Sequence, residues 1–216
     1  MCGRYANHVE KMRGWADVLE GWPCGVELSY NVSPTQTVPV FTSAGGVAAR
    51  WGLIPSWSKE INTTYSTFNA RIEGIDAKPA YRNAWKQSQR CLIPATGYYE
   101  WKGEKGSKQP YFVHSPKGDP LVFAGLYEPA RNEIPASCTI ITKAAIGHMA
   151  DLHIRVPVML SLKNAVDWYT LPPSSALELA KSENLADVDY YPVSIAVGNS
   201  RNDDVRLIQR IPDGTL

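Results

Sequence analysis

The chain has 216 residues, of which 44% are hydrophobic and 20% are charged, and this balance excludes an intrinsically disordered or collagen-like protein. Lysine and arginine total 22 against 21 acidic residues, so the net charge of +1 gives no global argument for nucleic acid, and an anionic partner would need a local basic patch. The 16 glycines and 16 prolines favour short strands and turns over a helical bundle.

Short runs rich in β-branched and aromatic residues predict strands along the chain, and turn-forming segments such as KGEKGSK and SPKGDP separate them. In chain order these runs are VPVFTS, AARWGL, RCLIPAT, GYYEW, PYFVHS, PLVFAGLY and SCTIITK. Helical patterns are fewer, and they lie at Val9 to Leu19, Ala80 to Gln87, Asn164 to Tyr169 and Ser174 to Lys181, the last with Ser174 as its cap. We predict one α+β domain over residues 1–216, built around a curved, largely antiparallel, barrel-like sheet with short flanking helices.

The composition of the termini and the cysteine spacing bear on cellular context. No apolar run approaches the roughly 18 residues of a transmembrane helix, and the opening MCGRYA lacks a signal-peptide pattern, so we expect a cytoplasmic protein without a membrane partner. The 4 cysteines are far apart and form no CxxC pair, so we expect no metal site. Cys91 and Cys138 lie in apolar runs and are expected to be buried small hydrophobes.

Cys2 has a special position, because removal of Met1 would leave a cysteine with a free α-amine at the start of the chain. Such an amine titrates at about 7.7–8.0 and a thiol at about 8.5 in model peptides, so both are partly nucleophilic at neutral pH. Together they can trap an aldehyde, because the amine forms a Schiff base and the thiol closes on it to give a five-membered thiazolidine. The same terminus could act as an N-terminal nucleophile in amide hydrolysis, and its position also allows an incidental cysteine.

Two later segments carry polar residues suited to such chemistry. In TFNARIE, Asn69 offers a donor and an acceptor, and Arg71 would project from the same face of an extended segment, which suits a sugar-phosphate. In GYYEW, strand alternation places Glu100 on the opposite face from Tyr99 and Trp101, where apolar surroundings would suit a carboxylate to proton transfer. Each segment also has an ordinary interpretation, a solvated loop for the first and a half-exposed surface strand for the second.

Three further segments are less specific. His153 stands before an apolar strand and two residues before Arg155, and histidine suits acid–base work near neutral pH, although a lone histidine is more often structural. Arg201 lies in a polar, basic loop after a strand, which could hold a phosphate or be an ordinary surface turn. Trp51 and Trp57 in RWGLIPSW could stack on bases, although at least one of them is expected in the core.

Taken together, these segments resemble the SRAP family (SOS response-associated peptidase domain), whose members are also called abasic-site processing proteins. The matching pieces run in family order over nearly the whole chain: MCGRYA, YNVSPTQ, RWGLIPSW, FNARIE, RCLIPATGYYEW, HIRVPVML and PVSIAVGNSRNDD. The sequence departs from the family pattern around the histidine, where Ile154 replaces a polar or acidic residue and Val156 replaces a methionine.

The resemblance implies a monomeric protein, without a cofactor, that recognises abasic sites in single-stranded DNA. It would form a stable thiazolidine crosslink through its N-terminal cysteine, with slow reversal, and would associate with the nucleoid when bound to DNA. The physics is consistent, because a site without a base must be recognised through backbone contacts, strand flexibility and aldehyde chemistry.

The resemblance also implies roles for individual residues. Cys2 would be the nucleophile and its α-amine the Schiff-base partner, Asn69 would orient the deoxyribose and the terminus, and Glu100 would assist proton transfers. His153 would act as acid and base on the sugar oxygen, in ring opening and in release of the crosslink. The side chains that would hold phosphates, stack on bases or wedge a duplex end are Arg4, Arg71, Arg155, Trp51 and Trp57.

Two other activities stay open. An autoprocessing or thiol peptidase could use Cys2 with Asn69, Glu100 and His153, but only Met1 precedes Cys2, so there is little to process. A single-strand DNA-binding module without a covalent step is the second alternative. Its binding would be weak if purely electrostatic, because such binding grows with the number of phosphates neutralised and the net charge is +1.

Overall fold

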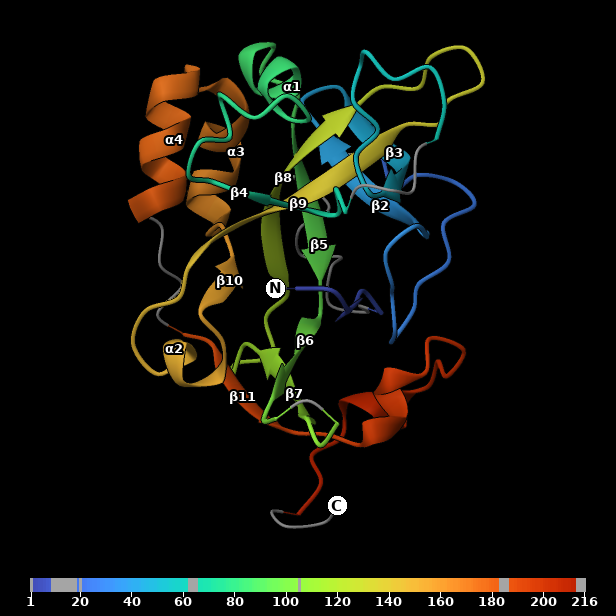
Figure 1. The fold of residues 1–216 in the computed structure, drawn as a ribbon, viewed down its shortest axis with the longest axis vertical. Coiled ribbons are helices and arrows are strands. Elements are labelled where there is room, and N and C mark those ends of the chain that lie inside the picture. The colour runs from blue at the N-terminus through green and yellow to red at the C-terminus, as the bar shows by residue number, and fades with distance from the viewer. Residues whose placement is uncertain are drawn as a thin grey trace.

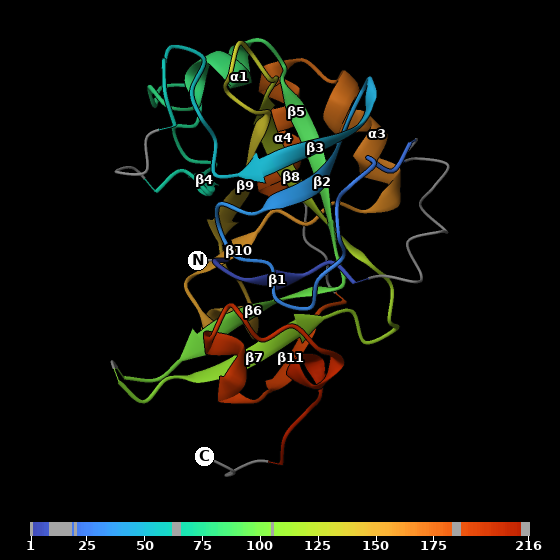
Figure 2. The same ribbon diagram turned by 90° about the vertical axis from the view of Figure 1, so that its right-hand side faces the viewer.

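The computed structural model describes residues 2–8, 19, 21–61, 66–104, 106–182 and 187–212, whose strands form two sheets (Figure 1, Figure 2). The smaller sheet has the order β1 (Tyr5–Ala6), β6 (Gly97–Lys102), β7 (Gln109–His114) and β11 (Asp189–Pro192). The larger sheet has the order β10 (Arg155–Pro157), β9 (Ser137–Ala144), β3 (Gly45–Trp51), β2 (Thr37–Thr42), β5 (Arg90–Ala95) and β8 (Leu121–Glu128), and β4 (Asn69–Arg71) pairs with β9.

Only the pairs that β3 and β4 make with β9 are parallel among the named strands of the described ranges. The predicted α+β class and the largely antiparallel pairing are therefore confirmed. The strands divide between two sheets where one was expected, and the larger sheet is the curved one.

Strand β9 organises the larger sheet, because it has different partners along its two edges. Near its start it pairs with β8 on one edge and with β3 on the other, which closes β9, β3, β2, β5 and β8 into a ring. Farther along, Ile140 pairs with Asn69 of β4, and Ala144 pairs with Arg155 of β10 on the opposite edge. Two segments far apart in sequence therefore flank one strand, and both lie beside predicted site residues.

The chain passes from the larger sheet to the smaller one between β5 and β6, where only Thr96 separates the two strands. Gly97 at the start of β6 lies so close to β7 that a Cβ atom there would be 2.4 Å from its nearest atoms, which excludes any side chain. Strand β1 then adds to an edge of β6, with Tyr5 opposite Tyr98. This register brings the N-terminal residues alongside the strand that carries Glu100.

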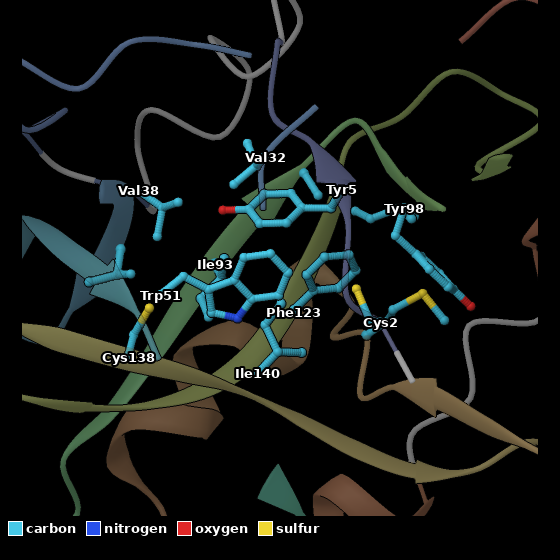
Figure 3. Packing of buried hydrophobic residues seen from close by; sticks show 14 of the residues in the cluster. Cys2, Tyr5, Val32, Val38, Trp51, Ile93, Tyr98, Phe123, Cys138 and Ile140 are labelled. Atoms are coloured by element: carbon cyan, nitrogen blue, oxygen red, sulfur yellow. The ribbon is translucent and has the colours of Figure 1, made fainter. Parts of the chain in front are cut away.

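Aromatic and aliphatic residues from both sheets form the core (Figure 3). Trp51 is completely buried, its ring lies edge-on to Tyr5 with centroids 5.0 Å apart, and its indole N–H donates to the Phe68 carbonyl at 2.9 Å. Cys91 and Cys138 are also completely buried, which confirms their predicted role as small hydrophobes. A side chain without exposed surface cannot stack on a base, so the stacking role predicted for Trp51 is corrected to a core role.

Helices cover the outside of the ring (Figure 1). Alternate residues of β5 face opposite ways. Cys91 and Ile93 belong to the inner hydrophobic cluster, which contains Trp51, and Leu92 belongs to a second, outer cluster that the helices cover. The outer cluster includes Trp85 of α1 (Arg82–Lys86) and Trp168 of α3 (Leu162–Thr170), and α4 (Pro173–Ser182) completes this layer. The helix α2 (Met149–Leu152) is a single turn between β9 and β10. No helix of the described ranges is long and apolar enough to cross a membrane.

Three of the four predicted helices are confirmed, with α1 shorter than expected. Helix α4 begins at Pro173, so Ser174 lies in its first turn and does not cap it. A proline is favoured at the first helical position, because the N–H that it lacks would have no partner within the helix there. The helix predicted at Val9 to Leu19 lies outside the described residues apart from Leu19 itself.

Candidate active site

The N-terminal segment runs into the protein interior. Cys2 is completely buried, in the same cluster as Tyr98 of β6 and Leu152 of α2 (Figure 3). The backbone of the segment follows β6, and the Tyr99 N–H donates to the Arg4 carbonyl at 2.9 Å. Residue 2 is therefore held at a defined position beside the strand that carries Glu100.

Asn69, the first residue of β4, contacts the N-terminal residue directly. Its Nδ2 donates to the Cys2 carbonyl oxygen at 2.6 Å, and its own backbone carbonyl accepts from the Tyr81 hydroxyl at 3.0 Å. Its side-chain Oδ1 is buried and has no hydrogen-bond partner among the described residues. A buried acceptor without a partner costs free energy, so this oxygen is suited to accept a hydrogen bond from a bound ligand.

Glu100 and His153 face each other at the same place. The carboxylate Oε2 lies 3.9 Å from His153 Nδ1, and Glu100 is 6% exposed, which rules out the half-exposed surface strand as its setting. The backbone N–H of Arg155 donates to His153 Nδ1 at 3.0 Å. The Arg155 carbonyl oxygen also lies 3.2 Å from the same nitrogen, so the Arg155 backbone contacts one side of the imidazole and orients the ring.

The Cys2 thiol lies in an apolar environment close to a carboxylate. Burial raises the pKa of the thiol, and the nearby Glu100 carboxylate raises it further. The thiol is therefore protonated at neutral pH, in contrast to the partial thiolate expected from model peptides.

The predicted phosphate-binding arginines differ in their surroundings. Arg71 at the end of β4 and Arg201 in the C-terminal loop are exposed. Arg155 is buried, and its guanidinium binds both oxygens of the Glu73 carboxylate, at 2.8 and 2.9 Å. DNA can reach the two exposed arginines directly, whereas a phosphate at Arg155 would have to compete with Glu73.

Asn31 has no predicted role, yet it connects the two ends of the chain. Its Nδ2 donates to the carbonyl oxygens of Val197, Asn199 and Asn202 at 3.3, 3.0 and 2.7 Å, and its Oδ1 accepts from Arg4 Nη1 at 2.9 Å. The motifs YNVSPTQ and PVSIAVGNSRNDD therefore meet in space. Arg4 is half-buried in this network, which gives part of its guanidinium a structural role.

Trp57, unlike the other tryptophan of RWGLIPSW, is 57% exposed. Its indole N–H donates to the Pro79 carbonyl at 3.2 Å, and both residues line a pocket of about 680 Å³ together with Tyr81. The Tyr81 hydroxyl is the group that binds the Asn69 backbone. The pocket therefore adjoins Asn69, whose side chain binds the Cys2 carbonyl, and the stacking role of the exposed Trp57 stays a prediction.

Comparison with known proteins identifies the family of this chain. A sequence model of the SOS response associated peptidase (SRAP) family matches residues 1–200. The chain belongs to the SRAP family. Its relatives include the abasic site processing protein YoqW of Bacillus subtilis, which is 33% identical over 97% of this chain and 99% of the relative. The abasic site processing protein HMCES of Xenopus tropicalis is 31% identical over 88% of this chain and 68% of the relative.

Solved structures show the same SRAP-like fold. A crystal structure of a protein from Bacteroides thetaiotaomicron superposes with a TM-score of 0.83, at 23% identity, over 98% of this chain and 100% of its own. A phage-related protein of Bordetella bronchiseptica gives a TM-score of 0.68 at 28% identity, over 89% of this chain and 94% of its own. Both confirm the α+β architecture.

The two departures of this SRAP chain from the family pattern take different positions. Ile154 is 75% exposed beside His153, whereas Val156 is buried in the cluster that contains Cys2. Neither position is one of the proposed catalytic residues. No group of three or more histidine, cysteine or acidic side chains is placed to hold a metal ion within the described ranges.

Proposed function

We propose that this SRAP protein recognises abasic sites in single-stranded DNA and forms a thiazolidine with the ring-opened deoxyribose through Cys2, after removal of Met1. The observation that carries the proposal is the gathering of polar side chains around residue 2. Asn69 Nδ2 donates to the Cys2 carbonyl oxygen at 2.6 Å. The Glu100 carboxylate raises the pKa of the Cys2 thiol and lies 3.9 Å from His153 Nδ1. The names of the relatives support abasic DNA as the substrate.

The reaction couples the two nucleophiles of Cys2 to a single aldehyde carbon, C1′ of the opened sugar. The α-amine adds to this carbon, and loss of water from the adduct gives a Schiff base. The sulfur then adds to the same carbon while the thiol proton passes to the nitrogen. The product is the sum of aldehyde and aminothiol with net loss of a water molecule, and no oxidant or metal is consumed.

The surrounding side chains take complementary parts. Glu100 accepts a proton from the α-amine and carries the thiol proton during ring closure. Its carboxylate is close enough to the Cys2 thiol to raise the pKa of that thiol. His153 donates a ring proton to the sugar ring oxygen as the ring opens, and takes it back when the crosslink is released. Asn69 fixes the terminus through Nδ2 and receives a sugar hydroxyl at its buried Oδ1.

The environment of the Cys2 thiol disfavours a thiol peptidase. Such an enzyme needs a thiolate as its first nucleophile, and both burial and Glu100 raise the pKa of Cys2. An aldehyde trap tolerates a protonated thiol, because the amine attacks first. The environment of the thiol therefore favours the trap over the peptidase.

Exposed arginines and Trp57 are proposed to hold the DNA strand. We expect Arg71→Ala to weaken binding to single-stranded DNA and to lower the slope of log Kd against log salt by about 0.7, since one phosphate contact is lost. Anisotropy titrations at several salt concentrations measure this slope. Lys117→Ala is the matched control, because Lys117 is an exposed cation paired with Asp187. Equal slopes for Arg71→Ala and the unmodified protein would contradict the phosphate contact.

The proposed function is tested on a denaturing gel with single-stranded DNA that carries one abasic site. The protein starting at Cys2 should give a band that survives denaturation, and DNA without the lesion should give none. A protein with an uncleaved N-terminal tag should also give none, because its amine is an amide. Normal native-gel binding without the denaturation-resistant band would instead indicate a non-covalent binding module.

A further inference from the structure

Arg155 is buried and takes part in a cluster of contacts that the proposed reaction does not use. Its Nη1 and Nη2 bind the two oxygens of the Glu73 carboxylate at 2.8 and 2.9 Å. The same Nη2 donates to the Thr142 backbone carbonyl at 2.6 Å and lies 3.2 Å from the Thr142 hydroxyl. Two parallel N–H···O bonds fix the planar guanidinium in orientation as well as in distance.

These three residues come from three neighbouring segments. Glu73 follows β4, Thr142 lies on β9, and Arg155 begins β10. Strand β9 separates β4 from β10, so the ion pair reaches across β9 and ties its two flanking strands together. We call the contacts among Glu73, Thr142 and Arg155 the clamp.

The clamp lies between the two sides of the candidate active site. Asn69, which holds the Cys2 carbonyl, starts the strand that leads to Glu73. On the other side, the backbone N–H of Arg155 donates to His153 Nδ1 at 3.0 Å, and the Arg155 carbonyl lies 3.2 Å from the same nitrogen. The orientation of the imidazole therefore depends on the placement of the Arg155 backbone.

We infer that Glu73 is a positioning residue, which acts through Arg155 to fix the His153 ring relative to Asn69 and Cys2. The inference rests on the proposed function and adds a residue to it. Hydrogen bonding by Arg155 holds the pKa of Glu73 below its usual range, so the clamp stays charged as the pH falls from neutral towards that lowered pKa and is lost only below it. Misplacement of a catalytic group by about 1 Å can cost on the order of 100-fold in rate, so a positioning residue has a measurable effect.

An opposite role for Glu73 makes a different prediction. If Arg155 were a phosphate ligand restrained by Glu73, loss of the carboxylate would release the guanidinium and tighten DNA binding. The positions of both Nη atoms favour the clamp, since each binds Glu73 and the Arg155 side chain is 10% exposed. Glu73 itself is 54% exposed on its side chain, so its replacement is expected to leave the fold intact.

The test compares Glu73→Gln with the unmodified protein. We expect unchanged affinity for undamaged single-stranded DNA and a crosslinking rate on abasic DNA that is lower by about 10-fold, because the ring is misplaced without being removed. In a His153→Ala background, Glu73→Gln should have no further effect, since a positioning residue acts only through the group it positions. Glu178→Gln, which breaks the exposed pair with Lys181, is the control and should change nothing.

Nitrogen NMR of the imidazole gives a readout that does not depend on crosslinking. The unmodified protein should show a single imidazole tautomer, and Glu73→Gln should show a mixture of tautomers. An unchanged tautomer in Glu73→Gln, tighter DNA binding, or a full additional loss in the His153→Ala background would each overturn the inference. Absence of any crosslink in the unmodified protein would overturn the proposed function instead, and the NMR comparison would still decide the role of Glu73.

Discussion

Cys2→Ala is expected to abolish the denaturation-resistant crosslink while leaving DNA binding in native gels intact. Alanine keeps the α-amine, so the Schiff base can still form, but nothing closes on it and it hydrolyses. An external thiol should not rescue the product, because a well-oriented intramolecular group can have an effective concentration on the order of 10⁵ M or more. The completely buried position of Cys2 leaves no comparable space for a free thiol.

The control for this variant uses borohydride, which reduces a Schiff base to a stable amine. Cys2→Ala should give a covalent band only when borohydride is present, whereas the unmodified protein should give one without it. A stable band from Cys2→Ala without reductant would show that another residue traps the lesion. No band even with borohydride would show that the α-amine is not placed to attack.

Glu100→Gln is expected to slow crosslinking by about 10²–10⁴-fold, because a glutamine of nearly the same shape cannot take up a proton. The direction of this effect separates two accounts of the site. Glu100 raises the pKa of the Cys2 thiol, so its neutral replacement lowers that pKa and increases the thiolate fraction. If thiolate formation limited the rate, Glu100→Gln would react faster.

Single-turnover crosslinking measured from pH 6 to 9 gives the required rates. Trp101→Phe serves as the matched control, since Trp101 is the next residue on β6 and is half-buried. It should crosslink at nearly the rate of the unmodified protein. Faster crosslinking by Glu100→Gln, or a rate equal to that of the unmodified protein at every pH, would remove Glu100 from proton transfer.

Local patterns predicted the longer strands of this fold well. Runs such as PLVFAGLY and SCTIITK became β8 and β9, because alternation and β-branched residues are properties of the segment itself. The strands β1, β4, β10 and β11 have only two to four residues, which is too short for a period to be seen. They are defined by their pairing with β6, β7 and β9, and for β1, β4 and β11 the partner strand is distant in sequence.

The candidate site was likewise predicted only in part from the sequence. The order of the motifs was enough to select Cys2, Asn69, Glu100 and His153, and the fold brings these four segments together. Trp51 and Trp57 could not be distinguished, because they lie six residues apart in the motif RWGLIPSW and only the fold decides that the first is buried and the second 57% exposed.

The ion-pair and hydrogen-bond partners of polar residues could not be predicted from the sequence for a similar reason. The family resemblance implied that Arg155 holds a phosphate, and nothing in HIRVP indicates a nearby carboxylate. Glu73 lies 82 residues earlier and meets Arg155 only because β4 and β10 flank the same strand. Asn31 had no assigned role, although its three carbonyl contacts organise the loop that carries Arg201.

The central claim is that the α-amine and thiol of Cys2 both bond to C1′ of an abasic site, and mass spectrometry of the crosslinked peptide tests this directly. The protein is reacted with single-stranded DNA bearing one abasic site, without reductant, and then digested with protease and nuclease. We predict an N-terminal peptide that begins at Cys2, lacks Met1, carries the sugar remnant less one water, and has no free thiol to alkylate. An adduct on a lysine, an adduct on a peptide that retains Met1, or a modified peptide whose Cys2 thiol is still alkylated would contradict the claim.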